Sequence, residues 1–286
     1  MKRLLKALIF SNVLVAAGAG ALTLGSGHLW GTPAGELAGL GALVFCATLA
    51  VYSLDRWVEG RGEDRLAGSV RHVWLQGHRR TMSALIGVGL IGAGLSLWWV
   101  RLETVLALIP PGMVSVGYSL PVLVWRSARL KDVPGFKTPA TALVWAAVTC
   151  GLPLVESGAA VSPQVAAWLV GERTLFIYAL TLPFDVRDLQ SDRLGGVLTL
   201  AGRLGEARCF DIAQVAASVV VLSALLRGLC GVAFGQWATA LASLAALGLL
   251  LAGKRRFAAR RPPGELYYAG GLDGLILVQA LLLLLG

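Results

Sequence analysis

The chain contains few charged residues, few histidines and few cysteines for its length. Only 14% of its 286 residues are Asp, Glu, Lys or Arg, whereas a soluble domain usually carries about 25%. The three histidines show no metal-ligand spacing, and the four cysteines lie in or beside apolar stretches, where we interpret them as small core residues. The composition therefore argues against a soluble domain, and neither residue type indicates a metal site.

Hydrophobic residues instead make up 56% of the sequence. Nine apolar segments can be marked, each near the roughly 20 residues that cross the hydrocarbon core of a membrane. They are approximately 7–25, 35–54, 82–100, 104–125, 139–156, 164–184, 210–226, 232–252 and 266–285. Backbone groups in lipid must be satisfied within the segment, so each is expected to be a helix. The expected fold class is all-α: one polytopic membrane domain, 1–286, with nine transmembrane helices.

Lys and Arg are distributed unevenly between the connecting segments. In the nine-span scheme all but three of the 25 basic residues fall on one side, the exceptions being Arg101, Arg173 and Arg227. The positive-inside rule then places the N-terminus in the cytoplasm and the C-terminus outside. This predicts a multi-pass integral membrane protein, of a bacterial inner membrane. The net charge of +9 comes from these basic loops and does not indicate a nucleic-acid partner.

The sixth apolar segment carries an internal charged pair, Glu172-Arg173. A charged pair at membrane depth is costly unless it faces the interior of the bundle. We therefore expect a shorter span that begins near Arg173 and runs through Leu189.

Three carboxylates follow this segment at a helical spacing. Asp185, Asp188 and Asp192 fall at i, i+3 and i+7, which places them on one helix face. Like charges on one stripe repel, and a divalent metal is one candidate for the compensating charge. The alternative is an acidic face on a solvated helix end, with Arg187 and Arg193 as counter-ions.

A second acidic stretch ends the second apolar segment. Asp55 and Glu59 are four residues apart and share a helix face. In the nine-span scheme both acidic stretches lie on the cytoplasmic side, so up to five carboxylates surround one cytoplasmic cavity. A ligand set made only of oxygen favours a hard cation such as Mg²⁺, which prefers carboxylates together with phosphates and waters.

Basic residues lie among these acids and in the facing loop. They are Arg56, Arg129, Lys131, Lys137, Arg187 and Arg193. Acids that hold a metal, with bases around it, suit a diphosphate. A lipid diphosphate would keep its tail among the helices and its head at the membrane surface.

The second acidic stretch, 185–193 (DVRDLQSDR), continues into 199–205 (TLAGRLG). On these residues the chain resembles the UbiA superfamily of intramembrane prenyltransferases. Three further stretches are similar to that family: 118–121 (YSLP), 131–137 (KDVPGFK), and 265–268 (ELYY) with 273–274 (DG). The first acidic motif departs from the family, because Val51 and Tyr52 stand where the family usually has Asn-Asp.

The resemblance implies nine helices and a Mg²⁺-dependent transfer of a polyprenyl group from its diphosphate to a small-molecule or lipid acceptor. The implied metal ligands are Asp55, Glu59, Asp185, Asp188 and Asp192, the last three also being catalytic. The implied substrate-binding residues are Arg56, Arg129, Lys131, Lys137, Arg187, Arg193, Tyr118 and Asn12. For Tyr118 helix packing, and for Asn12 a bond between helices, are the alternative interpretations.

Two other functions remain open at this point. The missing acids at Val51 and Tyr52 suit a catalytically reduced relative that binds an isoprenoid or a partner protein. A cation or lipid transporter is a third reading. Transporters carry ionisable groups near the bilayer midplane, whereas the acids here cluster at one surface, which argues against that reading.

Overall fold

The chain was analysed in a computed structural model that describes residues 10–59, 74, 77–120, 129–194, 196–231 and 235–285. Across these residues the chain is helical and contains no strand. The long helices are α2 (Val13–Ser26), α3 (Ala38–Glu59), α5 (Arg79–Ser96), α6 (Leu102–Ser119), α7 (Lys137–Ala146), α9 (Pro163–Arg187), α12 (Glu206–Leu229), α13 (Gln236–Ala258) and α14 (Asp273–Leu285). The short helices α8 (Leu152–Ser157), α10 (Leu189–Leu194) and α11 (Leu200–Leu204) connect them, together with 3₁₀ turns such as η5 (Leu130–Asp132).

Eight helices among the described residues are long and apolar enough to cross a membrane, so the chain is a multi-pass integral membrane protein. They are Val13–Trp30, Ala34–Val58, Arg79–Trp99, Lys137–Ser157, Pro163–Arg187, Glu206–Leu229, Gln236–Ala258 and Leu266–Leu285. Each overlaps one of the nine predicted segments. The remaining segment, 104–125, contains α6, a helix with Pro110 and Pro111 in its interior. The last residues of this segment, 121–125, lie outside the described residues.

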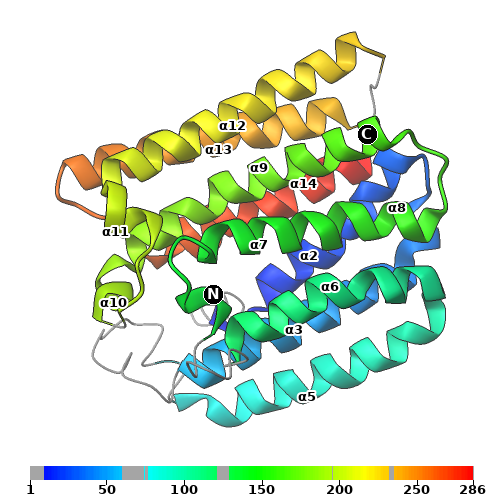
Figure 1. Cartoon of the computed structure of the whole chain (residues 1–286), viewed down its shortest axis with the longest axis horizontal. Coiled ribbons are helices and arrows are strands. Elements are labelled where there is room, and N and C mark those ends of the chain that lie inside the picture. Colours follow the sequence, from blue (N-terminus) through cyan, green and yellow to red (C-terminus); the bar gives the residue numbers. More distant parts are fainter. Residues whose placement is uncertain are drawn as a thin grey trace.

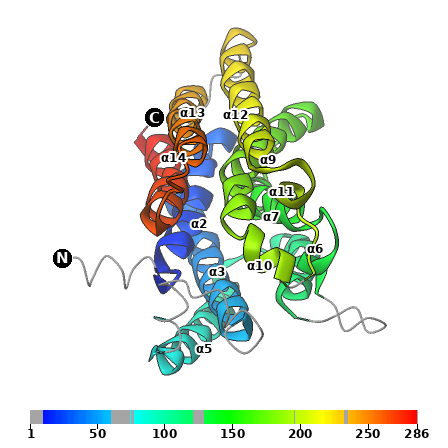
Figure 2. The same ribbon diagram turned by 90° about the vertical axis from the view of Figure 1, so that its left-hand side faces the viewer.

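The helices run side by side along one axis (Figure 1). Viewed along the bundle, α2, α3, α5 and α14 lie on one side, and α6, α7, α9 and α12 on the other (Figure 2). Helix α3 packs against α2 and α5, and α9 packs against α7 and α12. Two short π-helical stretches, η6 (Ala147–Gly151) and η7 (Leu266–Leu272), adjoin α7 and α14.

Small residues let these helices approach closely, as is usual in membranes. At Gly89 of α5 an added Cβ would lie 2.7 Å from the carbonyl oxygen of Cys46 on α3, so only glycine fits there. Cys150 and Cys209 are buried, as predicted for small core residues. Cys230, which follows α12, is exposed, so the prediction of a core position is wrong for this cysteine.

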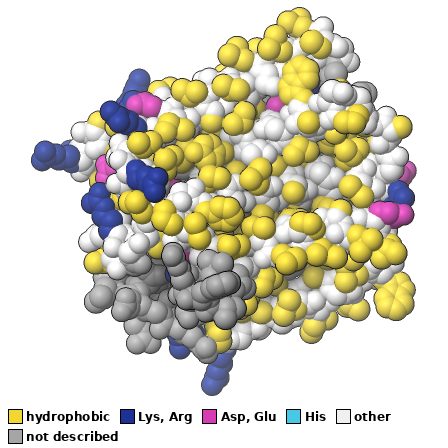
Figure 3. Space-filling view, in the orientation of Figure 1, with side chains coloured by type: hydrophobic (Ala, Val, Ile, Leu, Met, Phe, Trp, Pro, Cys, Tyr) yellow, Lys and Arg dark blue, Asp and Glu magenta, His cyan; other side chains and the backbone are white. Residues whose placement is uncertain are grey.

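Charge is concentrated at the ends of the bundle. In the space-filling view hydrophobic side chains cover the body of the molecule, and most Lys and Arg side chains gather at the left edge (Figure 3). That edge carries α10 and α11 and is called the charged end below (Figure 1). At the opposite end Arg101 pairs with Glu103 at the start of α6. An apolar belt between polar ends is the surface expected of a membrane-spanning bundle.

The prediction that the sixth span begins near Arg173 is wrong. Helix α9 is continuous from Pro163 to Arg187, and both Glu172 and Arg173 are buried within it. Glu172 pairs with Arg227 of α12, with Arg227 Nε 3.0 Å from each carboxylate oxygen. Arg173 donates to the hydroxyl oxygens of Ser26 and Thr149, at 3.2 and 3.4 Å. Because both charged groups find partners inside the bundle, the helix does not have to end before them.

Candidate active site

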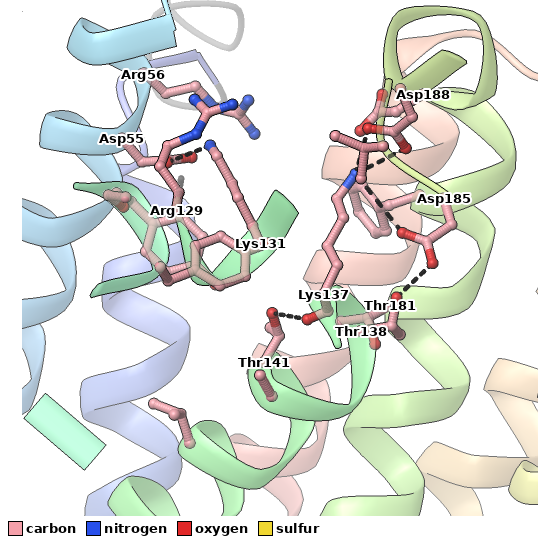
Figure 4. Close-up of a pocket in the computed structure, with 18 of the residues that line it drawn as sticks. Asp55, Arg56, Arg129, Lys131, Lys137, Thr138, Thr141, Thr181, Asp185 and Asp188 are labelled. Atoms are coloured by element: carbon pink, nitrogen blue, oxygen red, sulfur yellow. Dashed lines mark hydrogen bonds and ion pairs between the residues drawn. The ribbon is translucent and has the colours of Figure 1, made fainter. Parts of the chain in front are cut away.

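A cavity of about 370 Å³ lies at the charged end of the bundle. Its first side is formed by α3, α6 and η5, and its second side by α7, α9 and α10. Charged residues from both sides project toward each other across the gap (Figure 4). The cavity is therefore lined by polar groups that come from distant parts of the sequence.

On the first side a carboxylate and an ammonium group form a close ion pair. Lys131 Nζ lies 2.6 Å from Asp55 Oδ1. The same Nζ lies 5.6 Å from the centre of the Tyr118 ring, within the range of a cation–π contact. The Lys131 side chain is only 8% exposed, so its charge is held in place by these two contacts.

Two arginines complete the first side. Arg129 binds Asp132 through two parallel bonds, Nε–Oδ2 at 3.0 Å and Nη2–Oδ1 at 2.9 Å. Burial acts to raise the pKa of the Asp132 carboxyl, but the bonds from Arg129 outweigh it and hold that pKa below its usual value. Arg56 follows Asp55 on α3 and projects toward the same space (Figure 4). The first side thus presents three cations to the cavity.

On the second side a lysine bridges two carboxylates. Lys137 Nζ lies 3.0 Å from both carboxylate oxygens of Asp192 and 3.7 Å from Asp185 Oδ1. Asp185 is almost fully buried, and the Thr138 hydroxyl donates to its Oδ2 at 2.5 Å. Neighbouring residues of α7 therefore bind carboxylates that lie nearly two helical turns apart along α9 and α10.

Two loop contacts bring the start of α7 to these acids. The backbone N–H of Gly135 donates to the Leu198 carbonyl oxygen at 3.2 Å, which joins the segment before α7 to the segment before α11. The N–H of Val197 donates to the Asp192 carbonyl oxygen at 2.8 Å. The Thr199 hydroxyl caps α11 by accepting from Gly202 N–H. Val197 and Leu198 thus join the segment before α7 to α10, and Lys137 lies beside Asp192.

Asp188 lies at the junction of α9 and α10. Its backbone N–H donates to Phe184, and its carbonyl oxygen accepts from the N–H of Asp192, so helical bonding continues across the junction. Arg187 binds Asp188 at 2.7 and 3.0 Å and also approaches Glu265 at 3.5 Å. The Arg187 guanidinium carbon lies 4.8 Å from the Phe184 ring centre, so this base is held by an aromatic face as well as by acids.

Burial and neighbouring bases act differently on the two outer acids. Burial acts to raise the pKa of Asp188, but the adjacent Arg187 guanidinium outweighs it and lowers that pKa to about 2. For Asp192 burial is the larger influence and raises the pKa to about 6, even though Lys137 contacts it. On the second side three carboxylates, Asp185, Asp188 and Asp192, outnumber the two bases Lys137 and Arg187.

The donor set of the cavity fits Mg²⁺ in its chemistry. The carboxylates of Asp55, Asp185, Asp188 and Asp192 supply only oxygen, the ligand that Mg²⁺ prefers. Within the described part of the chain no three His, Cys, Asp or Glu side chains stand close enough to share one ion, because lysines and an arginine lie between the acids. A bound divalent ion would require Lys137 to move from Asp192 toward another anion.

Most of the predicted site residues meet at this cavity. The predicted residues that line it are Asp55, Arg56, Tyr118, Arg129, Lys131, Lys137, Asp185, Arg187, Asp188 and Asp192. Arg193 is exposed on α10, and Asn12 is buried before α2; neither lines the cavity. The Glu59 side chain lies outside the described residues. The alternative interpretation is an acidic face exposed to solvent. Arg187 is a counter-ion, as that interpretation expects, but Asp185 is only 3% exposed and is therefore not solvated.

Sequence reasoning missed several lining residues. Thr138 follows the predicted Lys137, and its role depends on a contact with α9 that no spacing reveals. Glu265 and Asp273 flank η7, and both line the cavity. The resemblance to the family assigns no role to either acid. π-Helical segments often mark functional sites, but the sequence does not reveal η7.

No protein-family profile matches the sequence, and no curated protein matches it. The fold does match solved structures. A UbiA homologue from Archaeoglobus fulgidus bound to GPP and Mg²⁺ has a TM-score of 0.66 at 13% identity, over 97% of this chain and 100% of that one. An apo UbiA homologue from Aeropyrum pernix K1 has a TM-score of 0.65 at 16% identity, over 96% and 94%.

A digeranylgeranylglyceryl phosphate synthase is also similar, with a TM-score of 0.54 at 13% identity over 100% of this chain and 99% of that one. At such low identity these likenesses show the fold alone. The chain is thus an integral membrane helical bundle with the fold of UbiA homologues, and its cavity lies at the charged end of that fold.

Proposed function

We propose that this protein is a member of the UbiA superfamily and an intramembrane prenyltransferase. It transfers a polyprenyl group from its diphosphate, with Mg²⁺ as cofactor, to a small-molecule or lipid acceptor that is not identified. The observation that carries this proposal is a cavity at one end of an apolar bundle, where three cations face a second side on which carboxylates outnumber bases. The fold of homologues that bind GPP or DMAPP with Mg²⁺ supports it.

The two sides of the cavity have different roles in this reaction. Lys131, Arg129 and Arg56 bind the outer oxygens of the diphosphate. Asp185, Asp188 and Asp192, together with Asp55 and Glu59 of the first acidic stretch, would hold Mg²⁺, which would neutralise the diphosphate as it leaves. The bond from the prenyl carbon to the diphosphate oxygen breaks, and its electron pair departs with the diphosphate.

Phe184 and Tyr118 shield the prenyl carbon, and Lys137 lies near the diphosphate. The Phe184 and Tyr118 rings lie at the cavity wall and shield the developing positive charge from water. With Asp192 as a metal ligand, Lys137, which now binds Asp192, would be available to the diphosphate. The acceptor bonds to the prenyl carbon from the membrane side, and its proton passes to the released diphosphate.

The topology belongs to the same proposal. Helix α6 counts as one further crossing, which gives nine transmembrane helices in one domain, 1–286. The excess of Lys and Arg at the charged end supports an orientation with the cavity and the N-terminus on the cytoplasmic side of a bacterial inner membrane, and the C-terminus outside.

A second candidate is a catalytically reduced relative that binds an isoprenoid or a partner protein. The observation that favours it is Tyr52, which stands where the family usually has an acid and whose hydroxyl oxygen accepts a bond from Trp145 Nε1 at 2.8 Å. Tyr52 therefore supplies no carboxylate to the first side.

A thermal unfolding experiment with purified protein in detergent separates these functions. We expect prenyl diphosphates of one to four isoprene units to raise the midpoint only when Mg²⁺ is present. A ligand at 100 times its dissociation constant stabilises the folded state by about 2.7 kcal/mol. The Asp188→Asn variant should lose this response, because Asp188 is one of the metal ligands, while the protein still folds.

The matched control is Asp211→Asn, which makes the same change at an acid of α12 that pairs with Lys254 outside the cavity. This control should respond like the wild type. A full response in Asp188→Asn would contradict the metal-site assignment. Binding without transfer to any acceptor would support the reduced relative, and the absence of any response in folded wild-type protein would contradict both functions.

A further inference from the structure

Beneath its charged mouth the cavity ends on a pair of aromatic side chains. Tyr52 of α3 and Trp145 of α7 come from opposite sides and line the cavity together. Their rings meet edge to face, with centres 6.4 Å apart, and the indole Nε1 donates to the phenol oxygen at 2.8 Å. This cross-cavity pair, Tyr52–Trp145, is called the aromatic floor below.

The direction of each helix explains why these two side chains meet. Side chains lean toward the N-terminus of their own helix. Helix α3 runs toward the charged end, so Tyr52 leans away from the mouth. Helix α7 starts at the mouth with Lys137, so Trp145 leans back toward it. The two side chains therefore close on each other between the helices.

On the other helices the lining of the cavity also ends near the level of the aromatic floor. On α3, among the described residues, the cavity lining begins at Val51 and continues toward the mouth. On α6 it begins at Val114, and on α9 at Thr181. On α7 it ends at Trp145, after which Ala146 is fully buried in the core. Below this level Ala146 of α7 and Cys150 of η6 are both fully buried.

The space above the floor is short. Trp145 lies eight residues beyond Lys137, or about 12 Å along α7 at 1.5 Å per residue. An extended isoprene unit, with four chain bonds, spans roughly 5 Å by the bond lengths that give a three-bond residue about 3.5 Å. At roughly 5 Å per unit, the roughly 12 Å between Lys137 and Trp145 along α7 leaves room for no more than about two isoprene units.

We infer that the aromatic floor sets the length of the prenyl donor, so that this site takes a diphosphate of no more than two isoprene units. This inference rests on the proposed function, since it assumes that a prenyl diphosphate enters with its head at the mouth. It gives Tyr52 a role as a specificity residue in place of the metal-ligand role that its position has in the family. Trp145 positions Tyr52 through the indole hydrogen bond.

The test compares donors of increasing length on the full chain in detergent with Mg²⁺. Dissociation constants are measured from thermal unfolding midpoints for dimethylallyl, geranyl, farnesyl and geranylgeranyl diphosphates, and for inorganic diphosphate as the head group alone. We expect the wild type to bind geranylgeranyl diphosphate at least tenfold more weakly than geranyl diphosphate, since even a methylene-sized misfit in an apolar pocket changes discrimination by about 10–200-fold.

Two variants open the floor from opposite sides. Tyr52→Val and Trp145→Leu should each reduce the tenfold preference to less than threefold, by strengthening the binding of the longer donors while inorganic diphosphate binds as before. The control is Phe257→Leu, which truncates an aromatic residue paired with Phe210 in a separate core cluster away from the cavity. It should keep the wild-type preference.

Three outcomes overturn the inference, and one of them also overturns the proposed function. Equal wild-type affinity for geranyl and geranylgeranyl diphosphates would show that the floor does not limit the chain. An unchanged preference in folded Tyr52→Val would show that another element sets the length. If neither inorganic diphosphate nor any prenyl diphosphate binds the wild type, the head-group site is absent, and both the inference and the proposed function are wrong.

Discussion

Replacement of Glu172 by Gln removes the charge partner of a fully buried arginine. Arg227 is 0% exposed and Glu172 is 5% exposed, with Arg227 Nε 3.0 Å from both carboxylate oxygens. Ser223 donates to Glu172 at 2.7 Å and itself accepts from Trp168 Nε1 at 2.6 Å. The pair joins α9 to the last turn of α12. In the Glu172→Gln variant the guanidinium would remain in the apolar interior without a counter-charge.

The expected loss is large because one partner of a buried ion pair is removed. Breaking such a pair costs about 3–5 kcal/mol. At about 2–4 °C per kcal/mol for chains of this size class, the unfolding midpoint should fall by roughly 6–20 °C. The midpoint is measured by intrinsic tryptophan fluorescence during heating in detergent, at one fixed scan rate because unfolding is expected to be irreversible.

Two further variants make this experiment decisive. Glu156→Gln is the matched control, because Glu156 only accepts bonds from Arg101 in an exposed position and should cost less than about 1 kcal/mol. The double variant Glu172→Gln with Arg227→Gln should recover part of the lost stability, since no uncompensated charge is left. A Glu172→Gln midpoint equal to that of the control would refute the reasoning, as would a double variant less stable than either single one.

Two other predictions concern packing and the cavity. Gly89→Ala should lower the unfolding midpoint by the equivalent of about 1–3 kcal/mol, because its Cβ would meet the backbone of α3. The control is Gly87→Ala, which should be neutral or stabilising because an added Cβ would find nothing within 4 Å. Equal losses in both variants would contradict the close approach. Lys137→Met should destabilise the protein by about 1–3 kcal/mol, because Asp192 loses its ion-pair partner. Added Mg²⁺ should then raise the midpoint of this variant more than that of the wild type, and identical responses would count against a shared site.

The first acidic motif shows what a comparison with a family leaves out. The sequence identified Asp55, which lines the cavity, and through the resemblance predicted the loss of an acid at position 52. It did not reveal that Tyr52 bonds to Trp145, because the two residues are 93 positions apart and come from different helices. Nor did it connect Asp55 with Lys131, which lies 76 residues further along the chain. Such partners depend on how helices pack, and spacing along one helix carries no information about that.

For Glu172 and Arg173 the sequence predicted a span boundary that the structure does not have. Their charges were interpreted as the boundary of a span because a charge in lipid is costly. The cost is removed by partners on α2, on η6 and on α12, and these partners become neighbours only after the bundle forms. The sequence rule was physically sound, but it was applied to an isolated helix.

The sequence alone determined the membrane-spanning helices, because the length of an apolar segment and its bonding in lipid depend only on local residues. It also determined the acidic stripe of Asp185, Asp188 and Asp192, because helical periodicity places i, i+3 and i+7 on one face whatever the rest of the chain does. The tertiary structure alone decided which bases neutralise those acids, where the cavity ends and which buried charges are paired. Each of these depends on contacts between segments distant in sequence, and the free energy of a buried charge is set by the groups that surround it in the folded bundle.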